Sequence, residues 1–128
     1  MLVVGAVLAL TTSVRVYVWQ DEIRLWVEAT RESPQKPRPW INLGRHAHAA
    51  KRYEDAAAAY RYAATLAERQ HTPEGRLARA YAEHNLAAAY LATGRVSDAR
   101  TVLTPLLARE PSFRHAAILA TTLPPEPK

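Results

Sequence analysis

The sequence predicts an all-α protein in which short helical hairpins stack side by side. The chain has 128 residues, is rich in alanine, and contains only four glycines and no cysteine. Several residues recur 43 positions apart, among them Leu43 with Leu86 and Ala56 with Ala99. Self-similarity at such a period is typical of folds built from repeated helical pairs. Small side chains let neighbouring helices approach closely, so composition and spacing favour the same architecture.

The first 19 residues differ from the rest of the chain. Residues 1–10 form an unbroken apolar run, and residues 14–19 form a second one that contains Arg15. A membrane span needs about 20 apolar residues, and no basic residue precedes the run, as one would in a signal peptide. We interpret residues 1–19 as the end of a transmembrane helix, with a signal peptide and a buried capping helix as the alternatives. Three residues would lie at the membrane interface: Arg15, Tyr17 and Trp19.

We expect residues 20–36 to form the second helix of an incomplete hairpin. Trp26 and Ala29 precede Tyr60 and Ala63 by 34 residues each, a spacing within the range of helical repeats. The predicted helix covers residues 20–33, because Pro34 cannot continue it.

Residues 37–70 predict the first complete hairpin, with helices over about 38–50 and 53–69. Gly44 is small enough for the second helix to approach closely, and Tyr60 fills the gap one turn beyond Ala56. The residues that anchor this hairpin are Trp40, Leu43, Gly44, Ala56, Tyr60 and Ala63.

The spacing between the two complete hairpins is 43 residues, whereas the spacing between the incomplete hairpin and the first complete one is 34. The difference of nine residues predicts an insertion over residues 71–79. Thr72 is expected to cap the helix that follows, with Pro73 in its first turn. The second hairpin spans residues 80–113, and Gly94 is expected to adopt a left-handed conformation between its helices. Its anchors are Leu86, Tyr90, Gly94, Ala99 and Pro111. A capping helix over 114–121 and a proline-rich tail over 122–128 complete the chain.

This pattern resembles the tetratricopeptide repeat family over residues 20–120. The resemblance implies a solenoid of about two and a half repeats plus a cap, preceded by an N-terminal apolar helix. The sequence departs from the family pattern at Ala47, Glu83 and Leu106. Residues 19–26, followed by Ser33-Pro34 and Asn42-Leu43-Gly44, also resemble the membrane-exit segment of bacterial polytopic glycosyltransferase-like proteins. That second resemblance implies a bacterial-type, membrane-anchored tail on the periplasmic or extracellular side.

Helical spacing places one face of each hairpin's first helix toward a concave groove. Asn42 and Asn85 occupy equivalent positions, and in the family an asparagine here often bonds the backbone of a bound peptide. The basic side chains beside them favour an acidic peptide or a terminal carboxylate as partner. The predicted groove residues are Arg38, Asn42, Arg45, His48, Tyr81, His84 and Asn85.

The sequence argues against catalysis and against metal or cofactor binding. It has no cysteine nucleophile, no glycine-rich phosphate loop and no histidine pair at metal-ligand spacing. Its formal charge of +5 is scattered rather than gathered into a stripe suited to nucleic acid. We therefore expect a membrane-anchored protein-protein interaction scaffold. The alternatives are a homo-oligomer or filament formed through open solenoid ends, and an accessory tail of a membrane glycosyltransferase.

Overall fold

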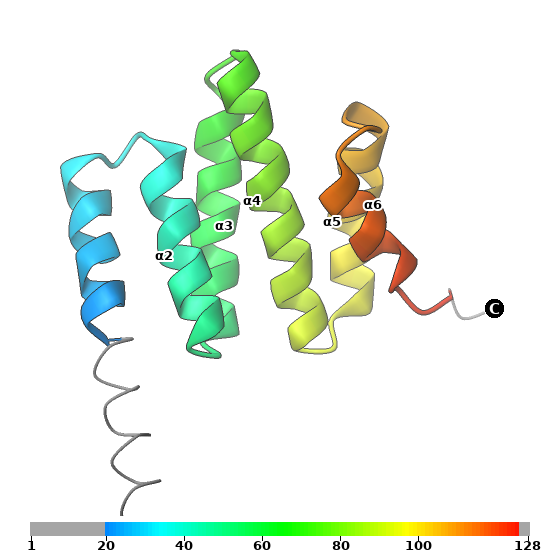
Figure 1. Ribbon diagram of the computed structural model, residues 1–128, viewed down its shortest axis with the longest axis horizontal. Coiled ribbons are helices and arrows are strands. Elements are labelled where there is room, and N and C mark those ends of the chain that lie inside the picture. Colours follow the sequence, from blue (N-terminus) through cyan, green and yellow to red (C-terminus); the bar gives the residue numbers. More distant parts are fainter. Residues whose placement is uncertain (1–19, 126–128) are drawn as a thin grey trace, which may run out of the picture.

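The computed structural model describes residues 20–125, and within that range all regular secondary structure is helical (Figure 1). The predicted all-α class is therefore confirmed for this part of the chain. The apolar segment 1–19, with the expected interface residues Arg15, Tyr17 and Trp19, lies outside the described residues. Between residues 20 and 125 no helix is long and apolar enough to cross a bilayer.

The helices lie beside one another in chain order (Figure 1). Helical residues 20–32 are followed by α2 (Pro37–Ala49), α3 (Tyr53–Glu68), α4 (Pro73–Ala92), α5 (Val96–Arg109) and α6 (Arg114–Thr121). From α2 onward, each helix contacts the next one in the chain, and α2 also contacts α4 while α4 contacts α6. In this arrangement α2, α4 and α6 form one layer, and α3 and α5 lie behind it.

The turn inside each hairpin has the same geometry. Lys51 and Gly94, 43 residues apart, have φ angles of 61° and 75°, so the expected left-handed conformation of Gly94 is confirmed. The next residue in each turn is Arg52 or Arg95, whose amide donates to the carbonyl five residues earlier at 2.8 or 2.9 Å. Each arginine Nε also donates to an aspartate three residues later, at 2.8 and 2.7 Å. The sequence periodicity thus corresponds to a structural repeat.

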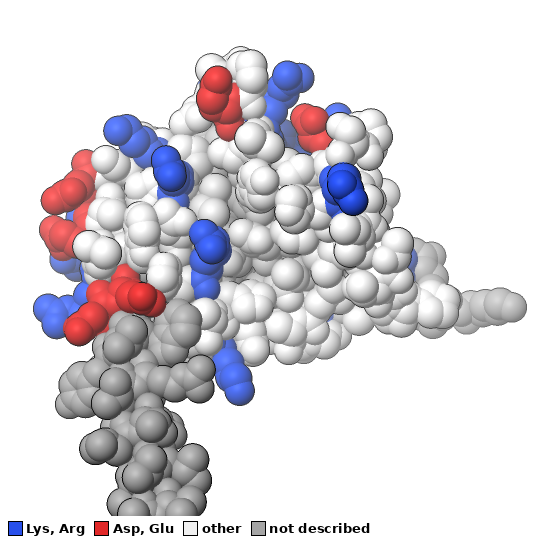
Figure 2. All heavy atoms as spheres, in the orientation of Figure 1, with Lys and Arg blue, Asp and Glu red and all other residues white. Residues whose placement is uncertain are grey.

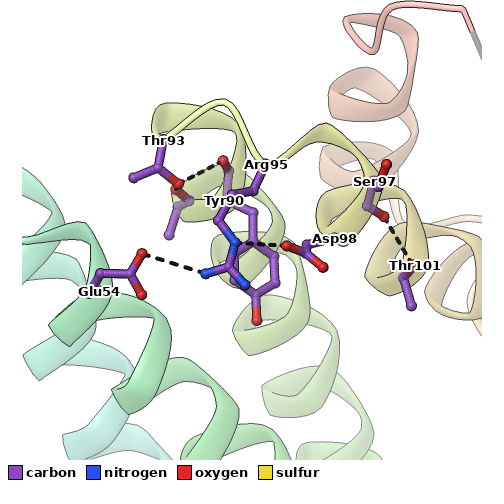
Figure 3. Close-up of polar contacts among 8 residues, drawn as sticks. Glu54, Tyr90, Thr93, Arg95, Ser97, Asp98 and Thr101 are labelled. Atoms are coloured by element: carbon purple, nitrogen blue, oxygen red, sulfur yellow. Dashed lines mark hydrogen bonds and ion pairs between the residues drawn. The ribbon is translucent and has the colours of Figure 1, made fainter. Parts of the chain in front are cut away.

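The second turn is tied to the first hairpin through Arg95 (Figure 3). Its guanidinium carbon lies 4.5 Å from the centroid of the Tyr90 ring, and its Nε donates to Asp98. Its Nη1 reaches Glu54 on α3 at 3.5 Å. The hydrogen bond to Asp98, and after it the Coulombic attraction of Asp98 and Glu54, raise the pKa of Arg95. The guanidinium therefore stays charged while it links α3 to the α4–α5 turn.

The core consists mostly of alanines with a few large side chains. Tyr60, Leu103 and Leu106 are the largest fully buried side chains. Six other predicted anchor residues are buried: Gly44, Ala56, Ala63, Leu86, Tyr90 and Ala99. Four are half-buried, namely Trp26, Ala29, Trp40 and Leu43, and two lie exposed in turns, Gly94 and Pro111. Because alanine methyls fill little space, the helix axes can lie close together.

The insertion lengthens α4 at its N-terminal end. α4 has 20 residues, against 13 in α2 and 16 in α3. Thr72 Oγ1 accepts a hydrogen bond from the Gly75 amide at 3.0 Å, and Pro73 is the first helical residue, so the predicted cap is confirmed. As a result, the α3–α4 turn projects beyond the rest of the stack (Figure 1).

A chain of ion pairs joins α3, α4 and α5 at Glu83, where the resemblance would place an aromatic residue. The Glu83 side chain is only 13% exposed and lies between two arginines. Its Oε1 accepts from Arg79 Nε at 2.9 Å, and its Oε2 pairs with Arg109 Nη2. Arg79 also contacts Glu68 at 3.0 Å. Because both of its oxygens pair with an arginine, the Glu83 carboxylate can lie in the partly buried contact between these helices.

The helical segment 20–32 docks on α2 through polar and aromatic contacts. Glu22 Oε2 lies 3.0 Å from His46 Nδ1, and the Trp26 ring stacks on His46 with centroids 6.0 Å apart. Trp40 Nε1 donates to the Pro34 carbonyl at 3.0 Å. These contacts place the half-hairpin against the first complete hairpin.

Candidate functional site

A hollow of about 960 Å³ lies between α2 and α4 and reaches α6. Six of the seven predicted groove residues line it, three from each hairpin: Arg38, Asn42, Arg45, Tyr81, His84 and Asn85. Asn42 and Asn85 are half-buried, while Arg38 and Arg45 are exposed. We call this surface the α2–α4 groove. The amides lie deeper in the structure than the guanidinium groups.

His48, the seventh predicted residue, is not among the residues that line the groove. Its ring packs edge-to-face on Tyr53 with centroids 5.0 Å apart, and burial lowers its pKa. The reason is local, because α2 ends at Ala49 and the chain turns at once into α3. In the last turn of α2, helical spacing therefore no longer predicts which side chains face the groove.

Several lining residues were not predicted from the sequence. Glu74, Leu77 and Ala78 come from the first turns of α4, and His115 comes from α6. Lys36 and Pro37 extend the groove along the start of α2, and Gln70 lies in the α3–α4 turn. Glu74 and Leu77 precede the predicted residue Tyr81 at helical spacing, so tracing this face back along α4 would have found them.

Aromatic and imidazole rings close the groove on the side of α6. Tyr81 packs edge-to-face on Phe113 with centroids 5.1 Å apart, and His84 lies 5.8 Å from His115. His84 Nδ1 is buried and has no hydrogen-bond partner within residues 20–125. Burial first, and then the charge of His115, lower the pKa of His84, so a neutral imidazole faces the groove at neutral pH.

The charged groups of the groove are mainly cationic. Three lining side chains carry positive charge, Lys36, Arg38 and Arg45, and one carries negative charge, Glu74. None of the three cations forms an ion pair with another residue of the described range. Figure 2 shows the face formed by α2, α4 and α6, on which separate basic side chains, together with acidic ones near the α3–α4 turn, border an uncharged area. This surface suits a ligand with both acidic and apolar parts.

The groove offers binding groups: cationic side chains, amides and apolar surface. Across residues 20–125 no three His, Asp or Glu side chains cluster closely enough to hold a metal ion. Comparisons of the chain with protein-family models, with curated proteins and with solved structures find no match. Fold and site together describe a helical-hairpin protein with a basic groove.

Proposed function

We propose that this chain is a non-catalytic interaction module of the tetratricopeptide type that binds an acidic peptide segment in the α2–α4 groove. The observation that carries the proposal is the convergence of Arg38, Arg45, Asn42 and Asn85 on one hollow. Each hairpin supplies one half-buried asparagine, 43 residues apart. Such a repeat of the same group along a groove matches the repeating backbone of an extended peptide.

The chemistry of the groove fits an extended acidic segment. An asparagine side chain both donates and accepts, so it can pair with an amide N–H and a carbonyl of a peptide that has no internal hydrogen bonds. The guanidinium groups of Arg38 and Arg45 are suited to bidentate bonds with carboxylates, including a terminal one.

Arg45→Glu in the full chain tests the proposal. The probe is a fluorescent peptide of glutamate, aspartate and serine, prepared with a free and with an amidated C-terminus. We expect the charge reversal to weaken anisotropy-detected binding by about tenfold, since it replaces attraction by repulsion. The control is Arg61→Glu on α3, an exposed arginine that does not line the groove. Equal losses in the two variants, or no loss in Arg45→Glu, would refute the groove as the binding site.

The apolar segment 1–19 supports a further part of the proposal, a membrane anchor. As the end of a transmembrane helix, its two apolar runs, residues 1–10 and 14–19, would hold the hairpins next to a bilayer. The full chain is then expected to co-sediment with phosphatidylcholine vesicles, and a chain that starts at residue 20 to stay in the supernatant. Co-sedimentation of both chains, or of neither, would contradict the membrane anchor. It would leave the proposed binding of a peptide in the groove unaffected.

Self-association is a second candidate, supported by exposed apolar residues at the two ends of the described stack. Leu25, in helical residues 20–32, is 64% exposed, and Ile118 on α6 is 61% exposed. A head-to-tail contact between these helices would extend the stack. Light scattering across a concentration series tests whether the protein self-associates. A monomeric mass at every concentration would exclude self-association.

A further inference from the structure

The insertion that lengthens α4 also builds one wall of the α2–α4 groove. Three groove-lining residues, Glu74, Leu77 and Ala78, belong to inserted residues 71–79. A 34-residue repeat without these residues would lack that wall. The Thr72 cap at the start of α4 fixes the added turns in a helical conformation. The groove is therefore extended by structure that the sequence periodicity does not require.

Apart from Glu74 at its start, the added wall is apolar and open to solvent. The Leu77 side chain is 53% exposed and Tyr81, one turn later, is 38% exposed. Both line the same hollow, together with Ala78 and with Ile41 from α2. A single exposed leucine is ordinary on a protein surface, but apolar side chains gathered in one concave site indicate binding. We call these four residues the apolar wall.

The cationic part of the groove lies along α2, on the other side of the hollow. Lys36 and Arg38 come from the start of α2 and Arg45 from its third turn, while the apolar wall comes chiefly from α4. A partner in the groove would thus meet positive charge on one side and an apolar surface on the other. Arg38 and Arg45 on α2 are exposed, as are Leu77 and Tyr81 on α4, so both parts are open to a partner at the same time.

We infer that the partner carries a large apolar side chain close to its acidic residues, and that the α4 extension selects for it. This inference rests on the proposed function, because it names a feature of the peptide that the same groove would bind. The apolar side chain lies on Leu77 and Tyr81, and its acidic neighbours face Arg38 and Arg45. Peptides with acidic residues alone fill only half of the site.

A display library of random short peptides, selected on the full chain, tests this inference. Selection on the wild type is expected to enrich peptides in which an acidic residue lies near leucine, phenylalanine or tryptophan. Selection on Leu77→Ala is expected to lose the apolar preference and keep the acidic one, whereas Arg45→Glu is expected to lose the acidic preference. Leu25→Ala is the matched control, because Leu25 is at least as exposed as Leu77 (64% against 53%) and does not line the groove.

One enriched peptide and its version with serine at the apolar position then give a quantitative check by calorimetry. We expect about a tenfold loss of affinity for the serine version on the wild type and less than about a threefold loss on Leu77→Ala. Equal losses on both proteins would overturn the inference, since the apolar side chain would not contact Leu77. Enrichment of acidic peptides without an apolar residue would also overturn it while leaving the proposed function intact. A selection without acidic preference would overturn both.

Discussion

Gly44 on α2 lies directly against the ring of Tyr60 on α3. A Cβ atom at Gly44 would be 2.5 Å from Tyr60 Cε1 and 2.7 Å from Cδ1. Tyr60 is only 2% exposed, so its ring is enclosed by other residues and cannot swing out to solvent. The equivalent residues of the second hairpin, 43 positions later, are Ala87 and Leu103, both buried. The two hairpins therefore fill the same contact with different pairs of side chains.

Gly44→Ala is predicted to destabilise the protein by about 1–3 kcal/mol, since a methyl group is added where no space exists. The double variant Gly44→Ala/Tyr60→Leu copies the pair found in the second hairpin. We expect it to be more stable than the sum of the two single changes, because the smaller side chain makes room for the methyl. Urea unfolding of all four proteins measures the coupling. Strict additivity would show that the two sites do not share this contact.

This contact shows how much of the fold the sequence predicts. The contact between Gly44 and Tyr60 appears only in the structure. The close helix approach at Gly44 and the gap that Tyr60 fills are both expected from spacing, because helical periodicity fixes which residues share a face. The same holds for the Thr72 cap and for the left-handed Gly94, where local backbone chemistry determines the outcome. Features of this kind depend on residues that are close in the sequence.

Features that depend on distant residues could not be predicted in the same way. Glu83 appears in the sequence as a departure from a repeat pattern, and only the fold brings Arg109 from α5 against it. His48 was expected in the groove, but its ring packs instead on Tyr53 of the next helix. His115 enters the groove from α6, and no spacing within α4 indicates it. Each case needs the relative placement of helices, which short-range patterns do not contain.

Thr72→Ala is predicted to cost about 1 kcal/mol of unfolding free energy, because the Gly75 amide loses its hydrogen-bond acceptor. The loss is concentrated in the first turn of α4, where the groove wall begins. Hydrogen exchange is therefore expected to speed up at residues 74–78 more than in α5. Thr72→Ser keeps the acceptor oxygen and serves as the control, with exchange close to that of the wild type. Similar exchange in Thr72→Ala and Thr72→Ser would show that the cap does not hold this turn.

Arg95→Ala is predicted to lower the midpoint of thermal unfolding more than Arg52→Ala does. Both arginines pair with an aspartate three residues later, but only Arg95 also stacks on Tyr90 and reaches Glu54. The change at Arg95 therefore loosens the link between the two hairpins, whereas the change at Arg52 affects one turn. High salt should reduce only part of the difference, since the contact with the ring also involves packing. Equal midpoints for the two variants would contradict this role of Arg95.

The stability of the protein is predicted to fall as the pH drops below about 6.5, in part through His84. Burial and the charge of His115 lower the pKa of His84 in the folded state below its ordinary value of 6.5. The unfolded chain then binds more protons than the folded one below that pH, so stability rises with pH. The contribution is fully present above about 6.5 and is lost as the pH falls toward the folded pKa. His48, whose pKa is also lowered by burial, adds to the same trend.

His84→Gln is therefore expected to flatten the pH dependence of the unfolding free energy below pH 6.5, leaving the part due to His48. The control is His71→Asn, because His71 is exposed in the α3–α4 turn with a φ angle of 48°, which asparagine tolerates. Urea unfolding at several pH values measures the slope for each protein. An unchanged slope in His84→Gln would show that His84 gains its proton equally in both states. The slope is also expected to flatten in His115→Ala, since removing that charge removes one of the two causes that lower the pKa of His84.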